Sequence, residues 1–157
     1  MLPVSPARGF TLVELITVLV VIAIGAAIAF PRLEGMAARA RARGALDQVS
    51  ADLYLARTLA VREGTRTVLR FQRRTDRPEC HRPTYSLVVR STPERTVRVT
   101  DLRLGPSACL RLGTVDSLVF NSRGLPSGGL NRKVYVVQPG HTDSLTFSLL
   151  GRTFRWY

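Results

Sequence analysis

Two hydrophobic patterns follow each other in the N-terminal part of the chain. Residues 10–30, FTLVELITVLVVIAIGAAIAF, form an almost unbroken apolar run, and about 20 apolar residues are what an α-helix needs to cross a bilayer core. In residues 31–64, apolar side chains instead recur every three or four positions, which is typical of a helix with one buried face. The stripe consists of Leu46, Val49, Leu53, Ala56 and Ala60. The sequence therefore predicts one helix of roughly fifty residues, apolar first and amphipathic afterwards.

Pro31 lies between the two parts of this helix. Proline lacks a backbone N–H and its ring clashes with the carbonyl one turn earlier, so a helix kink or local melting is expected there. Gly64 is the expected end of the amphipathic part.

After Gly64 the pattern changes to short runs rich in Val, Thr, Leu and aromatic residues, separated by Gly, Pro, Asn and Asp, which is typical of β-strands. Strands are expected in the segments 65–71, 84–91, 95–104, 108–113, 117–122, 133–138, 144–150 and 152–157. The alternation in 95–104 suits a sheet with one wet face, and its phase changes near Asp101, where a bulge is expected. The helix stripe needs a surface to pack on, and this sheet is the candidate. The predicted fold class is α+β, with a long N-terminal helix packed on an antiparallel β-sheet or sandwich.

The charge balance of the chain bears on its possible binding partners. The chain has 22 arginines and one lysine, Lys133, against eleven acidic residues, for a formal net charge of +12. Such an excess fits contact with nucleic acid, anionic lipid or an acidic partner. An arginine-favouring codon bias or a thermophilic host explains it equally well.

Catalytic or metal-binding patterns are not found in the sequence. No GxSxG, P-loop, paired-carboxylate cluster or metal-ligand spacing occurs, so we expect neither an enzyme nor a cofactor. His81 and His141 are expected in loops, and Asp143 and Ser144 as turn residues. Cys80 and Cys109 can form one disulfide if the domain lies outside the cytoplasm; two buried free thiols are the alternative.

The apolar run contains one carboxylate, Glu14. An ionisable group in hydrocarbon costs roughly 2.5–3.5 kcal/mol at the bilayer centre and usually marks a functional pairing; the alternative is a hydrated side chain at the bilayer interface. The segment MLPVSPARG precedes the apolar run, whereas a secretory signal peptide is cut after its apolar region.

The stretch RGFTLVEL, residues 8–15, resembles the type IV prepilin motif of type IV pilins and type II secretion pseudopilins. The resemblance implies that prepilin peptidase cuts between Gly9 and Phe10 and that Phe10 becomes an N-methylated N-terminus. It also implies that Glu14 pairs with the terminal amine of a neighbouring subunit, which sets the axial stagger of the filament. Breaking one partner of such a buried pair costs roughly 3–5 kcal/mol.

Residues 55–71, 119–129 and 149–156 resemble the GspH/FimT subfamily of these proteins. The resemblance implies a cleaved leader at 1–9, a transmembrane and filament-core helix at 10–30, its amphipathic continuation at 31–64 and a β domain at 65–157. The implied function is a minor pseudopilin, a structural subunit of a type II secretion pseudopilus or a type IV pilus that sits in the inner membrane before assembly. Its implied partners are other pilins, prepilin peptidase, the inner-membrane assembly platform and membrane lipid.

Two alternatives remain. One is a DNA-binding minor pilin: DNA-uptake members of the FimT group close with Gly-Arg-x-Arg, and here Gly151 and Arg152 fit, Phe154 replaces the second arginine and Arg155 follows it. Arg152 and Arg155 are therefore candidate DNA contacts, although a regular strand points them to opposite faces unless the tail frays. The competing interpretation of the tail is a last strand with Phe154 and Trp156 packed inward.

The other alternative is a single-pass membrane protein with a basic cytoplasmic β domain. Only Arg8 precedes the span, while several arginines follow it, and the positive-inside rule would place these in the cytoplasm. The arginines that follow are Arg32, Arg39, Arg41 and Arg43. The leader motif requires the reverse orientation.

Overall fold

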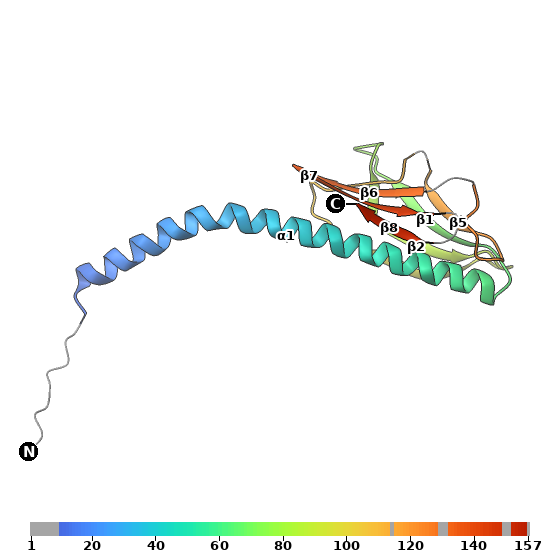
Figure 1. Ribbon diagram of the computed structural model, residues 1–157, viewed down its shortest axis with the longest axis horizontal. Helices are drawn as coiled ribbons and strands as arrows, with labels where there is room; N and C mark the ends of the chain where they lie inside the picture. Colours follow the sequence, from blue (N-terminus) through green and yellow to red (C-terminus); the bar gives the residue numbers. More distant parts are fainter. Residues whose placement is uncertain (1–9, 114, 129–131, 149–151, 157) are drawn as a thin grey trace, which may run out of the picture. The chain divides into compact units, whose positions relative to one another are not determined.

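The computed structural model describes residues 10–113, 115–128, 132–148 and 152–156; for residues 31, 32, 155 and 156 it describes the backbone only. The chain divides into two compact units, Met1–Ala37 and Ala38–Tyr157. One helix, α1 (Leu12–Arg62, 51 residues), begins in the first unit and ends in the second (Figure 1). The helix is continuous at Pro31, so the backbone does not melt there.

The described residues of the second unit form eight strands in one antiparallel sheet (Figure 1). The strands are β1 (Thr67–Arg73), β2 (His81–Val89), β3 (Arg95–Asp101), β4 (Cys109–Arg111), β5 (Ser117–Phe120), β6 (Arg132–Gln138), β7 (His141–Phe147) and β8 (Thr153–Trp156). Their order in the sheet is β5-β1-β2-β4-β6-β7-β8. β3 lies off this path: it pairs with the later part of β2, from Thr84 to Val89, whereas β4 pairs with β2 at its first residue, His81. The prediction of a long helix packed on an antiparallel sheet is confirmed.

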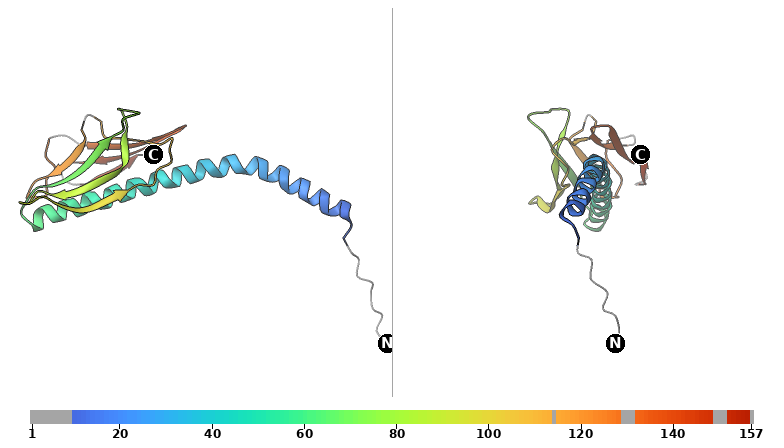
Figure 2. Two further views of the ribbon diagram at one scale, coloured as in Figure 1. Left: turned by 180° about the vertical axis from the view of Figure 1, so that it is seen from behind. Right: turned by 90° about the vertical axis from the view of Figure 1, so that its left-hand side faces the viewer.

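The second half of α1 lies along one face of this sheet (Figure 2). Every residue of the predicted stripe is at most 2 % exposed, and the stripe extends further toward the N-terminus through Ala42 and Ala45. The sheet side of the core consists mainly of Leu69, Phe71, Tyr85, Leu87, Leu110, Val134, Val136, Leu145 and Phe147. Small residues on the helix let it approach the sheet closely, and the larger side chains of the strands fill the space between them.

The segment 95–104 differs from its prediction. The strand β3 ends at Asp101, and Arg103 has a φ of 49°, so the change of phase near Asp101 marks the end of the strand rather than a bulge. The pairing between β2 and β3 is irregular at an earlier point: Leu87 pairs with Arg98 and Val88 with Thr96, so the register skips Val97. Val99 is 65 % exposed. The strand follows β2 along one edge of the sheet and has little apolar cover.

Candidate assembly site

The two residues at the centre of the predicted assembly site lie at the start of α1. Phe10 precedes the helix and is 81 % exposed, and Glu14 lies exposed in the first turn. The Glu14 N–H donates to the Thr11 hydroxyl at 3.2 Å. This bond makes Thr11 the N-cap of α1, with Glu14 at the third helical position, as in a capping box.

The sequence analysis missed this cap, although Thr-x-x-Glu before an apolar run is its known signature. A carboxylate in the first turn also interacts favourably with the positive end of the helix dipole. Glu14 therefore has a local role in starting the helix, in addition to any role between subunits.

The apolar segment of α1 is exposed along its length. The helix is long and apolar enough to cross a membrane, and none of its most apolar 18-residue stretch is buried within the protein. Large side chains such as Ile16, Val21 and Phe30 are between 51 % and 65 % exposed. A contiguous apolar surface of this size requires lipid or other protein chains around it.

Comparison with known proteins addresses both parts of the chain. Residues 5–30 match the family described as "Prokaryotic N-terminal methylation motif". The fold is similar to that of the type IV minor pilin FimU of Pseudomonas aeruginosa PAO1 in two crystal forms. In space group P21 the TM-score is 0.60 at 21 % identity, covering 76 % of this chain and 90 % of FimU. In P65 the TM-score is 0.56 at 21 % identity, covering 73 % and 92 %.

By motif and by fold, the chain is type IV pilin-like. No curated protein matches it. The motif covers the N-terminal segment, and the fold is the one found in FimU. The cleavage position after Gly9 lies outside the described residues.

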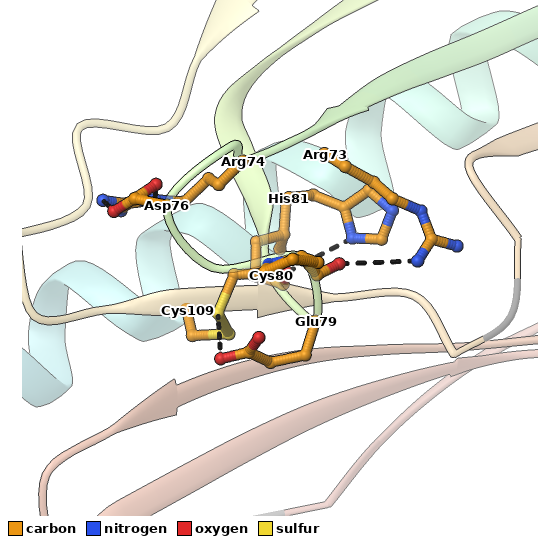
Figure 3. Close-up of a disulfide and its surroundings, with 9 residues drawn as sticks. Arg73, Arg74, Asp76, Glu79, Cys80, His81 and Cys109 are labelled. Atoms are coloured by element: carbon orange, nitrogen blue, oxygen red, sulfur yellow. Dashed lines mark hydrogen bonds and ion pairs between the residues drawn. A yellow bond between two sulfur atoms is a disulfide. The ribbon is translucent and has the colours of Figure 1, made fainter.

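The β domain of the pilin-like chain contains a disulfide between Cys80 and Cys109, whose Cα atoms are 5.2 Å apart (Figure 3). Cys80 directly precedes β2 and Cys109 begins β4. These two strands share a single register pair, His81 with Leu110, whereas the strands on either side of them pair over longer stretches. The disulfide therefore holds the sheet together at its narrowest junction.

The expectation that His81 lies in a loop is wrong. His81 begins β2 and is 1 % exposed; its Nε2 lies 3.0 Å from Asp116 Oδ1 and its Nδ1 lies 3.4 Å from the Leu110 carbonyl oxygen. The Arg73 guanidinium donates to the same Asp116 oxygen at 2.6 Å. The hydrogen bond from His81, followed by the one from Arg73, lowers the pKa of the Asp116 carboxyl. This group ties the disulfide-linked start of β2 to the segment before β5.

The other histidine was also misplaced by the sequence analysis. His141 begins β7, and Asp143 and Ser144 lie within that strand rather than in a turn. Asp143 is fully buried and its Oδ1 lies 2.9 Å from His141 Nε2. Among the residues that the structure describes, no three His, Cys, Asp or Glu side chains gather as metal ligands.

The tail forms the predicted last strand, but Phe154 does not pack inward as that interpretation expected. The backbone does not fray between 152 and 156, because β8 pairs with β7 from Thr153 to Trp156 and Ser148 N–H donates to the Arg152 carbonyl at 2.9 Å. Phe154 is 48 % exposed, so it is not packed inward. Arg152 is also exposed. For Arg155 only the register partner, Leu145, is described.

Proposed function

We propose that the chain is a minor pilin or pseudopilin of the GspH/FimT type, a structural subunit of a type IV pilus or type II secretion pseudopilus. The match of residues 5–30 to the N-terminal methylation motif carries this proposal. The apolar half of α1 anchors the subunit in the inner membrane and later packs in the filament core. The packed β domain is then carried on the outside of the filament, where other pilins and pseudopilins contact it.

In this function Gly9 is the last residue before the cut and Phe10 carries the new, methylated amine. The Glu14 carboxylate forms an ion pair with the N-terminal ammonium of Phe10 from a neighbouring subunit, because a buried carboxylate needs an opposite charge. Both side chains are exposed, Phe10 just before α1 and Glu14 in its first turn, which supports this pairing.

The disulfide supports a β domain on the periplasmic side of the membrane. Disulfides persist in oxidising compartments and are rare in the cytoplasm, and Cys80 and Cys109 are bonded. This favours the orientation that the leader requires over the one that the arginines after the span suggest, and it argues against a cytoplasmic β domain.

The deciding experiment is mass spectrometry of the protein from its native host. The expected chain begins at N-methylated Phe10, and Gly9→Val accumulates the full-length precursor because its side chain obstructs the peptidase. Gly25→Val is the matched control: Gly25 lies inside the apolar helix with open space around its Cβ position, so processing continues. An unprocessed wild-type chain in the native host would overturn the proposal.

DNA binding by the same subunit is the second candidate. Arg152 and Phe154 are both exposed and stand two residues apart, a spacing that places extended residues on one face. A guanidinium and an aromatic ring suit phosphate contact and base stacking. The test is the binding of the full chain, in neutral detergent, to single-stranded and duplex DNA. Arg152→Gln/Arg155→Gln and Phe154→Ala are compared with Arg77→Gln/Arg111→Gln, which removes two exposed arginines elsewhere.

A specific tail site predicts a shallower salt dependence and weaker binding for Arg152→Gln/Arg155→Gln. It also predicts a selective loss of single-stranded binding for Phe154→Ala. If Arg77→Gln/Arg111→Gln weakens DNA binding as much as the tail variants do, binding depends on overall positive charge alone, and the hypothesis of a DNA site at the tail is wrong.

A further inference from the structure

A cavity of about 460 Å³ lies at the end of the β domain where α1 stops. The turn after α1 and the outer ends of β1, β2 and β5 meet there. The cavity is lined by Gly64, Thr65, Arg66, Arg90, Asn121 and Ser122.

Two arginines line this cavity together, Arg66 directly before β1 and Arg90 directly after β2. Thr67 of β1 pairs with Val89 of β2, and one residue further out the Arg90 N–H donates to the Arg66 carbonyl at 2.8 Å. The Thr65 hydroxyl donates to the Arg90 carbonyl at 2.8 Å and closes the junction. Like charges placed opposite each other on neighbouring strands destabilise a sheet, so this arrangement gains stability from an anion between them.

The acidic residues nearby neutralise the two arginines only in part. The Glu94 carboxylate is shared, with one oxygen 3.3 Å from Arg90 Nε and the other 3.9 Å from Arg70 Nη2. Among the described residues no carboxylate forms an ion pair with Arg66. Arg66, Arg70, Arg90 and Glu94 together carry a net charge of +2, and of the three arginines Arg66 and Arg90 line the cavity.

Two uncharged side chains add hydrogen-bond donors to the lining. Asn121 Oδ1 accepts the N–H groups of Arg123 and Leu125, both at 3.0 Å. This fixes the side-chain oxygen toward its own loop and leaves the amide NH₂ as the group that can donate elsewhere. Ser122 follows directly and brings a hydroxyl to the same wall.

Two terminal carbonyl groups of α1 beside the cavity are occupied by backbone hydrogen bonds. Gly64 has a φ of 62° and ends the helix; the Thr65 N–H donates to the Ala60 carbonyl at 3.2 Å and the Gly64 N–H to the Val61 carbonyl at 3.4 Å. This is the Schellman arrangement, in which terminal carbonyls are occupied by the following N–H groups.

We propose that this cavity is a binding site for a phosphoryl group, with Arg66 and Arg90 as its principal ligands. Guanidinium groups bind tetrahedral oxyanions through paired N–H donors, and Ser122 and Asn121 complete the donor set. A phosphoryl dianion carries several acceptor oxygens, which can take hydrogen bonds from both guanidinium groups at once. The site lies in the β domain and does not depend on the proposed role in a filament.

The test is titration of the full chain, in neutral detergent at pH 8, with inorganic phosphate and with glycerol 3-phosphate. Sodium chloride and sodium acetate at matched ionic strength correct for screening. Binding is followed by calorimetry and by the thermal unfolding midpoint. Both phosphates are expected to bind and to raise the midpoint, and tighter binding of glycerol 3-phosphate would identify a ligand whose organic part also occupies the cavity.

The variant Arg66→Gln/Arg90→Gln is expected to weaken phosphate binding by more than about tenfold, since it removes two charged donors. Without phosphate its unfolding midpoint should equal or exceed that of the wild type, because the opposed charges are gone. Arg77→Gln/Arg111→Gln, with the same loss of charge outside the cavity, should bind as the wild type does. Absence of phosphate binding, its retention in the first variant or an equal loss in the second would overturn the proposal.

Discussion

The Tyr85 hydroxyl donates a 2.7 Å hydrogen bond to the carboxylate of Asp52, which is 1 % exposed on the sheet-facing side of α1. Thr100 donates to the same carboxylate at 2.8 Å and Arg98 at 3.1 Å. Burial alone would raise the pKa of Asp52, but the donated hydrogen bonds outweigh it and the pKa lies below its ordinary value. Burial and the nearby carboxylate raise the pKa of Tyr85. One buried anion therefore fixes the helix against β2 and β3.

Removing the Tyr85 hydroxyl should destabilise the β domain. Tyr85→Phe leaves the buried Asp52 carboxylate without its closest donor, so the free energy of unfolding should fall by about 1–3 kcal/mol. Tyr54→Phe is the matched control on the same helix, because Tyr54 is 57 % exposed, and its effect should stay within about 0.5 kcal/mol. Urea unfolding of the full chain in detergent measures both. Equal effects in the two variants would contradict the assigned role of the Asp52–Tyr85 bond.

The lowered pKa of Asp52 gives this contribution a defined pH dependence. A carboxyl whose folded-state pKa is depressed contributes stability that is present above its unfolded-state pKa of about 3.9 and lost as the pH falls through the folded-state pKa. The difference in unfolding free energy between wild type and Asp52→Asn should be constant from about pH 7 to 5 and shrink below about pH 4. Asp76 and Asp116 also have lowered pKa values, but they are present in both proteins and cancel. A difference that stays constant to pH 3 would show that folding does not change the pKa of Asp52, and a difference that grows as the pH falls from 7 to 4 would show that the carboxyl is protonated in the folded state.

The sequence predicted the helix and the strands because their signals are local. The stripe from Leu46 to Ala60 and the alternating strands repeat over a few residues, and packing requires those periods. Asp52 could have been found by the same rule, since it stands three residues after Val49 and four before Ala56, on the buried face. A polar residue there signals a buried partner.

The partners of the two histidines could not be predicted from local patterns. His81 is 35 residues from Asp116 in sequence, and their meeting depends on how β1, β2 and the segment before β5 are arranged. His141 was expected in a loop, and Asp143 and Ser144 as turn residues, because aspartate and serine are common in turns. In the structure the turn stops at Gly140, with a φ of 74°, and the strand begins directly after it.

Loss of the disulfide should weaken the junction between β2 and β4. Its two cysteines are 29 residues apart, so the chain-entropy model gives a loss of roughly 3–4 kcal/mol for Cys80→Ala/Cys109→Ala. A reductant should lower the unfolding midpoint of the wild type and leave that of the double variant unchanged. A wild-type midpoint that is insensitive to complete reduction, verified by thiol titration, would show that the sheet junction does not need the bond.

Glu14 has two separable roles, in starting α1 and in pairing with Phe10 of a neighbour. Glu14→Gln keeps a side chain suited to the third helical position of a capping box but removes the charge. Glu14→Val removes both and should insert into the membrane at least as well as the wild type, since a charge is removed from hydrocarbon. Glu34→Gln is the matched control, an exposed glutamate further along the same helix.

If the charge pair sets the register between subunits, Glu14→Gln and Glu14→Val should both be processed to Phe10 yet fail to enter filaments, while Glu34→Gln assembles. The physical reason is that an unpaired Phe10 ammonium in the filament core costs roughly 3–5 kcal/mol per broken pair. One hydrogen bond from this ammonium to the neutral side-chain amide of the Glu14→Gln variant would stabilise the filament by less than that. Incorporation is measured by immunoblotting sheared filaments against the membrane fraction, with mass spectrometry of the N-terminus in both. If Glu14→Gln assembles normally and only Glu14→Val fails, the capping role is the one that matters and the registering charge pair is dispensable in this subunit.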